Sequence, residues 1–142
     1  MRKQKGFSLI ELLIVVAIIL IIAAIAIPNL LRARMAANES SAVSSLRTIN
    51  TAEVTFNSTY PTTGFSPNLL ALGGALGAAC VPAPATACLI DAVLANNGNP
   101  PGSGKSGYMF TTGAGTVAGG VNVGYTALAV PITINQTGIR GF

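Results

Sequence analysis

The chain has 142 residues, of which 51% are apolar and 8% are charged, and it contains no His and no Trp. This length supports one domain with a modest core. Eight Lys and Arg residues oppose four Asp and Glu residues, but three of the bases, Arg2, Lys3 and Lys5, lie in the first five residues. The basic balance therefore does not indicate nucleic-acid binding.

The composition also argues against catalysis. A chain without His lacks the usual proton shuttle near neutral pH. No two of the four acids are close enough in sequence to suggest a catalytic dyad; they are Glu11, Glu39, Glu53 and Asp91. We therefore expect a protein that is not an enzyme, with no catalytic residues and no cofactor.

The first 31 residues consist of a short basic stretch followed by a long apolar run. Residues 12–31 contain no charge, and 20 residues form a helix of about 30 Å, which is enough to cross a bilayer. The basic end predicts a cytoplasmic amino terminus. Glu11 lies inside the apolar segment, and a carboxylate at mid-bilayer costs about 2.5–3.5 kcal/mol. Its presence predicts a partner for the carboxylate.

Two ordinary explanations compete for this segment. A secretory signal could be cut after Ala26, within Ala24-Ile25-Ala26, which would release a soluble binding protein that begins at Ile27. Alternatively, the segment could remain as a plain membrane anchor. Neither explanation accounts for Glu11.

The stretch KGFSLIELLIVVAI, residues 5–18, followed by Ala26-Ile27-Pro28-Asn29, resembles the type IV pilin family. The resemblance implies that residues 1–6 are a leader. Prepilin peptidase would cut between Gly6 and Phe7 and N-methylate Phe7, and the apolar helix would be kept. Because Gly6 has no Cβ, the backbone there can enter a tight proteolytic site in an extended conformation. The pseudopilins of type II secretion carry a similar leader, so pilus and pseudopilus both remain open.

The resemblance further implies a structural subunit of a type IV pilus. Its partners would be prepilin peptidase, the inner-membrane assembly platform, membrane lipid before assembly, and copies of itself in a helical filament; no specific nucleic acid is expected. The subunit would be a single-pass inner-membrane protein first and part of an extracellular pilus later. Glu11 would meet the cationic amine of Phe7 in a neighbouring copy and set the register of assembly. Adhesion, motility, DNA uptake and electron conduction are all compatible with this resemblance.

Beyond the apolar run, residues 32–58 predict an amphipathic continuation of the same helix. Apolar residues recur at spacings of three, four and seven up to about Asn57; they are Met35, Ala42, Val43, Leu46, Ile49, Ala52 and Phe56. Five charged residues mostly avoid this stripe and predict a solvated face; they are Arg32, Arg34, Glu39, Arg47 and Glu53. Pro28 predicts a bend or local opening of the helix. A helix from residue 7 to 57 would span about 75 Å.

Residues 59–142 predict a loop-rich head. Short helical turns are expected within residues 69–76 and 89–94, the second opened by Asp91. Strand patterns occupy residues 107–112, 121–130 and 132–134, with a turn-like stretch between the first two, and residues 138–142 are a candidate last strand. We therefore predict an α+β fold, in which a three-stranded antiparallel meander covers the apolar stripe of the long helix.

Cys80 and Cys88 enclose seven residues, a spacing that fits no common zinc pattern. Because the head would lie outside the cytoplasm, a disulfide is expected. Asp91 with Asn96, Asn97 and Asn99 offers a single carboxylate at poor spacing for calcium. We expect no metal site.

Overall fold

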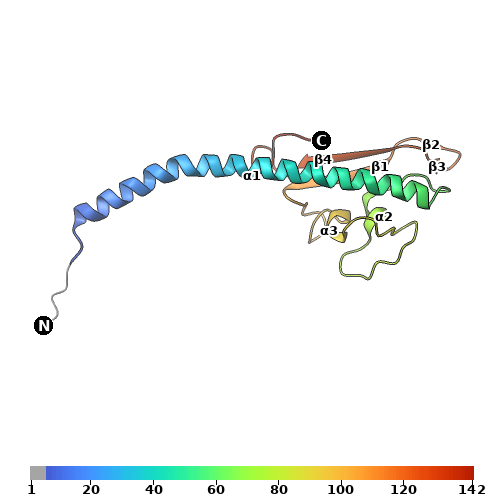
Figure 1. Ribbon diagram of the computed structural model, residues 1–142, viewed down its shortest axis with the longest axis horizontal. Helices are drawn as coiled ribbons and strands as arrows, with labels where there is room; N and C mark the ends of the chain where they lie inside the picture. The colour runs from blue at the N-terminus through green and yellow to red at the C-terminus, as the bar shows by residue number, and fades with distance from the viewer. Residues whose placement is uncertain (1–5) are drawn as a thin grey trace. The chain divides into compact units, whose positions relative to one another are not determined.

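The computed structural model describes residues 6–142 (Figure 1). The chain forms two compact units, one ending at Arg34 and the other running from Met35 to Phe142, and helix α1 contributes to both. The elements are α1 (Leu9–Thr59), α2 (Leu69–Gly73), α3 (Ala92–Ala95), β1 (Tyr108–Ala114), β2 (Val117–Ala118), β3 (Val121–Asn122) and β4 (Tyr125–Pro131). A long amino-terminal helix followed by small antiparallel sheets confirms the predicted α+β fold.

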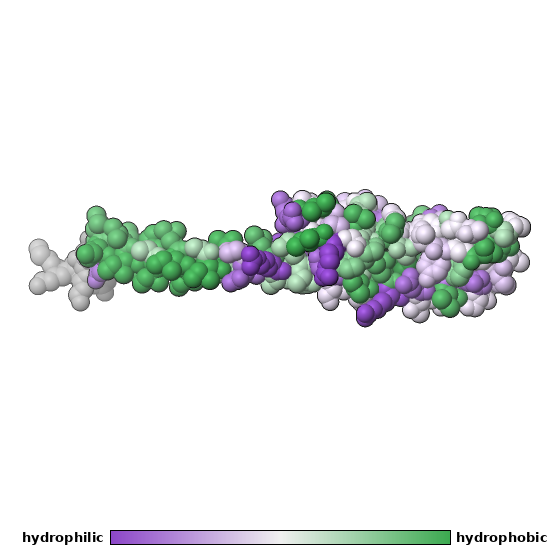
Figure 2. Space-filling view, turned by 90° about the horizontal axis from the view of Figure 1, so that it is seen from above, coloured by the Kyte–Doolittle hydropathy of each residue, from purple (hydrophilic) through white to green (hydrophobic). Residues whose placement is uncertain are grey.

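The first half of α1 is helical without interruption, and Pro28 lies inside it. Its large apolar side chains are exposed from Leu9 to Leu31, and an 18-residue window of the helix has a mean hydropathy of 3.3 with none of it buried. Figure 2 shows this as continuous apolar surface. The helix is long and apolar enough to cross a membrane.

The second half of α1 buries one face in the second unit. Each residue buried there has another three or four positions away, as one face of a helix requires; they are Ala42, Ser45, Ile49, Ala52, Glu53 and Phe56. Ile49 and Phe56 belong to the same apolar core as Tyr108 and Phe110 of β1. The predicted amphipathic stripe is therefore the surface on which the head packs.

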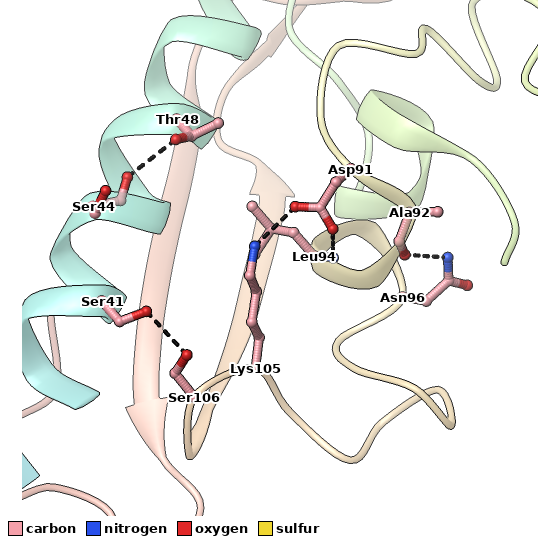
Figure 3. Close-up of polar contacts among 9 residues, drawn as sticks. All are labelled: Ser41, Ser44, Thr48, Asp91, Ala92, Leu94, Asn96, Lys105 and Ser106. Carbon is pink, nitrogen blue, oxygen red and sulfur yellow. Dashed lines mark hydrogen bonds and ion pairs between the residues drawn. The ribbon is translucent and has the colours of Figure 1, made fainter. Parts of the chain in front are cut away.

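The opposite face of this half of α1 is rich in Ser and Thr. The hydroxyls of Thr51 and Thr55 donate to the backbone carbonyls four residues earlier, at 3.0 and 2.9 Å, and Ser58 does the same at 2.6 Å. Figure 3 shows the equivalent contact from Thr48 to Ser44. These hydroxyls are thus satisfied within the helix itself.

The two short helices form where the sequence predicts helical turns, and each is capped by an acidic or amide side chain. Asn68 Oδ1 accepts from the amide of Ala71 at 3.0 Å, and Asp91 Oδ1 accepts from the amide of Leu94 at 2.9 Å. Such caps satisfy donors at the helix start that have no partner inside the helix. Leu72 of α2 and Leu94 are almost fully buried in the common core.

The strands differ from the predicted three-stranded meander. β1 pairs only with β4, antiparallel, in a register that places Phe110 opposite Ala129, and β2 pairs with β3 in a second two-stranded sheet. The predicted strand at residues 121–130 is divided between β3 and β4, and the backbone of Asn122 at the end of β3 bonds to the loop at residues 63–65, at 2.9 and 3.0 Å. The stretch predicted as a turn, residues 113–120, contains β2 and the two-residue loop of the β2–β3 hairpin, which has positive φ at Gly119 and Gly120.

The predicted strand at residues 132–134 is also absent from the described fold. The amide of Thr137 donates to the carbonyl of Thr133 at 2.9 Å, and Asn135 has a φ of 65°. This left-handed residue closes a turn. The last residue, Phe142, exchanges both backbone hydrogen bonds with Ala129 of β4, at 2.8 and 2.9 Å. Within the candidate last strand, Gly138 bridges to Ile134 and Phe142 pairs with Ala129, so no continuous strand forms there.

The free edge of β1 is covered by a side chain. The amide group of Asn97 donates to the carbonyl of Phe110 and accepts from its N–H, which reproduces the two bonds of a neighbouring strand. At Phe110 this edge is therefore not available to the strand of another chain.

Two charged residues assigned to the solvated face of α1 are not solvated. Glu53 is fully buried, and its carboxylate accepts from the amide of Ser66 at 2.9 Å and from the Ser66 hydroxyl at 2.6 Å. The assignment of Glu53 to solvent was therefore wrong, because a hydrogen-bonded carboxylate can replace an apolar residue on the buried face. Glu39, likewise, is largely covered by the segment at residues 139–140.

Candidate functional site

The amino-terminal segment combines an exposed peptide bond with the start of the apolar helix. Gly6, Phe7 and Ser8 precede the first helical residue, Leu9, and all three are exposed. A Cβ added to Gly6 would have no atom within 4 Å. Packing within the described chain therefore gives no reason for a glycine at this position.

Glu11 has a partner just before the start of its own helix. Its carboxylate Oε2 accepts a hydrogen bond from the amide of Ser8 at 3.0 Å, and the carbonyl of Ser8 accepts from the amide of Leu12 at 3.3 Å. Ser8 and Glu11 thus occupy the first and fourth positions of a capping box, in which the carboxylate of the fourth residue accepts from the amide of the first. Sequence analysis missed this role of Ser8, although the Ser-x-x-Glu spacing before an apolar run is its signature.

The predicted sites lie in different units. Gly6, Phe7, Glu11 and Pro28 all belong to the first unit, where Glu11 is the acidic residue in the first turn of α1. In the second unit the structure joins Cys80 and Cys88 in a disulfide with a Cα–Cα distance of 5.9 Å.

Asp91, weighed above as a calcium ligand, instead caps α3 and pairs with Lys105 Nζ at 2.8 Å (Figure 3). Partial burial, the largest single influence, raises the pKa of Asp91, but the bonds from Lys105 and from the helix amides together outweigh it, so the pKa is lowered. Among residues 6–142 no group of three or more His, Cys, Asp or Glu side chains could hold a metal ion.

A groove of about 430 Å³ lies in the second unit, beside the second half of α1. Its lining includes Glu39, Arg47, Arg140 and Phe142. Arg140 Nη2 donates to Glu39 Oε2 at 2.8 Å, and the backbone amides of Ile139 and Arg140 also donate to this carboxylate. The bond from the Arg140 side chain is the main cause of a lowered pKa for Glu39, and the same contact raises the pKa of Arg140. No sequence signal links residues 100 positions apart in this way.

Comparison with known proteins points to the same amino-terminal segment. The prokaryotic N-terminal methylation motif matches residues 1–27. The chain is 68% identical over 40 residues to the type IV wide pilus major component PilA4 of Thermus thermophilus, a match covering 28% of this chain and 30% of that protein. It is 48% identical over 54 residues to the type IV major pilin protein PilA of Myxococcus xanthus, covering 38% and 24%.

A third relative belongs to a different machinery. The chain is 41% identical over 66 residues to the type II secretion system core protein G of Vibrio cholerae, covering 44% of this chain and 45% of that protein. These matches thus span between 24 and 45% of the length of each relative. No solved structure matches the chain. The chain therefore carries the N-terminal methylation motif of prokaryotic prepilins, and part of its length is similar in sequence to type IV pilins and to a type II secretion core protein.

Proposed function

We propose that this chain is a structural subunit of a type IV pilus, cut between Gly6 and Phe7, N-methylated at Phe7 and assembled through its apolar helix. The observation that carries the proposal is the methylation motif at residues 1–27, followed directly by a helix whose apolar side chains are exposed up to Leu31. Such a surface is stable only in lipid or against other apolar helices. The subunit would reside in the inner membrane before assembly and would become part of an extracellular filament on assembly.

Copies of the chain would supply the apolar contacts that lipid provides before assembly. Pro28 lacks an amide donor and clashes with the preceding turn of a regular helix. A bend or opening at Pro28 would adjust the packing of neighbouring helices. The assembly platform of the inner membrane would act on the subunit before it leaves the bilayer.

The cut is tested by replacing Gly6. A bulky side chain there should exclude the backbone from the peptidase, so Gly6→Val leaves full-length precursor in the membrane. Because nothing in the described chain approaches the Gly6 Cβ position, the substitution cannot act by unfolding the subunit. Gly6→Ala is the matched control and should still be cut. A mature-sized band from Gly6→Val would refute cleavage at this bond.

Glu11 is proposed to neutralise the Phe7 amine of a neighbouring copy. The capping contact with Ser8 supplies a way to separate this role from helix capping. Glu11→Gln retains a side-chain oxygen that can accept from Ser8, since Gln also serves at this position of a capping box, but it removes the charge. If charge drives assembly, Glu11→Gln and Glu11→Ala should both abolish filaments while cleavage remains normal. Filaments from Glu11→Gln at the unaltered yield would contradict the charge mechanism.

A pseudopilin of type II secretion is the second candidate, favoured by the 41% identity over 66 residues to the core protein G. The two candidates predict different consequences of deleting the gene. A pilin deletion removes surface filaments and leaves protein export intact, whereas a pseudopilin deletion causes exported proteins to accumulate in the periplasm.

A further inference from the structure

The second unit has one charged side chain without a partner. Residues 35–142 contain six charged side chains. Four form the ion pairs Glu39–Arg140 and Asp91–Lys105, and a fifth, Glu53, is buried and hydrogen-bonded. Within the described chain, Arg47 has neither an ion pair nor a side-chain hydrogen bond.

Arg47 lines the groove described above, where a second guanidinium is already fixed in place. Arg140 is held by Glu39 on one side and lies over the Phe142 ring at 5.9 Å. The side chains of the groove supply two guanidiniums and one carboxylate, so the Arg47 guanidinium has no acidic side chain of its own. Val43 and the Phe142 ring contribute apolar walls. The groove therefore suits an acidic side chain accompanied by an apolar one.

In an assembly of identical copies, the counter-charge for Arg47 must come from this same sequence or from solvent. Glu53 is buried, Glu39 is saturated with hydrogen bonds, and Glu11 belongs to the apolar helix. Asp91 remains, with 53% of its side chain exposed despite its bond to Lys105.

The surroundings of Asp91 match the groove in a second respect. Val93 of α3, two residues after Asp91, is also exposed, at 36%. The start of α3 thus exposes both an acidic side chain, which can pair with a guanidinium, and an aliphatic one, which can pack on an apolar wall.

The two surfaces lie on opposite flanks of α1. The groove follows Glu39 and Val43, whereas Ser41, on the other flank, donates to Ser106 beside Lys105 at 3.0 Å. Figure 3 shows Ser41–Ser106 and Asp91–Lys105 on the same side of the helix. Two different surfaces on opposite flanks produce a head-to-tail contact, which does not close as a two-fold dimer and can repeat along an open helical array.

We propose that the Arg47 groove of one copy receives Asp91 and Val93 of the next copy along the filament. This inference rests on the proposed assembly and names the contact between its heads. Exposed ion pairs add little to affinity. The Arg47–Asp91 contact would therefore mainly fix the register of neighbouring heads and disfavour wrong packing.

The test is a zero-length cross-link in filaments sheared from cells. Arg47→Lys keeps the charge and supplies an amine, which a carbodiimide condenses with a carboxylate that touches it. We expect multimeric bands containing a peptide in which Lys at position 47 is joined to Asp91. Lys105 Nζ lies 2.8 Å from Asp91 Oδ2, so a cross-link between these two residues is the internal positive control for the reaction.

Two variants complete the design. Adding Asp91→Asn to Arg47→Lys should abolish the new link while keeping the α3 cap, because Asn caps as well as Asp. Arg47→Glu should lower the yield of filaments that survive shearing, while thermal unfolding of the subunit stays unchanged.

Three outcomes would overturn the proposal. In the first, filaments show only the Asp91–Lys105 link. In the second, position 47 is joined to Glu39 or to the terminal carboxylate of its own groove, and in the third, the link between position 47 and Asp91 occurs only within single copies. Absence of filaments from the unaltered chain would instead refute the proposed function itself.

Discussion

Replacing Ser66 with Ala tests the buried attachment between the long helix and the head. Glu53 of α1 is fully buried, and its carboxylate is held by the amide and the hydroxyl of Ser66, at 2.9 and 2.6 Å. Ser66→Ala removes the shorter bond and leaves the carboxylate in place. A hydrogen bond to a charged group contributes about 1.5–3 kcal/mol. At about 4 °C per kcal/mol for a domain of this size, the unfolding midpoint should fall by about 6–12 °C at pH 7.

The loss should depend on pH in a defined direction. Burial raises the pKa of Glu53, and the two bonds from Ser66 oppose that shift. Because the pKa is higher in the folded state than in the unfolded state, the contribution of this group to stability is present below the ordinary carboxylate pKa and is lost as pH rises through the folded-state pKa. Ser66→Ala removes an opposing bond and raises the folded-state pKa further. The cost of the substitution should therefore be larger at pH 7 than at pH 4, where a neutral hydrogen bond is worth about 0.5–1.5 kcal/mol.

The assay is thermal unfolding of the full chain in detergent, followed by near-ultraviolet circular dichroism at both pH values. Ser58→Ala is the matched control. The Ser58 hydroxyl also makes a 2.6 Å bond, but to the backbone of its own exposed helix, so its removal should shift the midpoint very little. Equal shifts for the two variants, or a Ser66→Ala shift that does not change with pH, would refute the reasoning.

Three further substitutions test other parts of the account. Gly138→Ala would place a Cβ 2.0 Å from the Tyr108 hydroxyl, and such overpacking should lower the free energy of unfolding by about 1–3 kcal/mol in chemical denaturation; an unchanged midpoint would contradict the packing. Arg140→Gln removes the main cause of the lowered pKa of Glu39, so NMR should show a higher titration midpoint for that carboxyl. The unaltered chain should lose the stabilisation from this pair as pH falls through the lowered pKa of Glu39, and the variant should lack that pH-dependent loss. Glu11→Gln should leave cleavage intact and abolish filaments by electron microscopy, and normal filaments would argue against its charge.

Periodicity predicted the long helix and its buried face because both depend on local spacing. The stripe through Ile49 and Phe56 was read from positions three and four apart, and the structure buries those residues. Glu53 occupies the same face, but its partner Ser66 lies beyond the helix end. Hydropathy therefore assigned this carboxylate to solvent, since only the folded chain supplies the bonds that make its burial possible.

The strands were predicted less accurately because their pairing depends on distant backbone groups. A continuous β-rich pattern ran through Asn122, but in the structure β3 ends at that residue, whose backbone bonds to the loop at residues 63–65. The edge of β1 is closed by the side chain of Asn97, a contact that no alternation of polar and apolar residues signals. In the candidate site, the motif around Gly6 could be recognised from the sequence. The Arg47 groove could not, because it is formed by residues from both ends of the second unit.

The most direct test of the central claim is the amino terminus of the subunit in filaments sheared from the cell surface. Mass spectrometry should find a chain that begins with N-methylated Phe7 and keeps the apolar segment through Leu31. A chain that begins at Ile27, or surface protein recovered only as soluble single copies, would contradict the account.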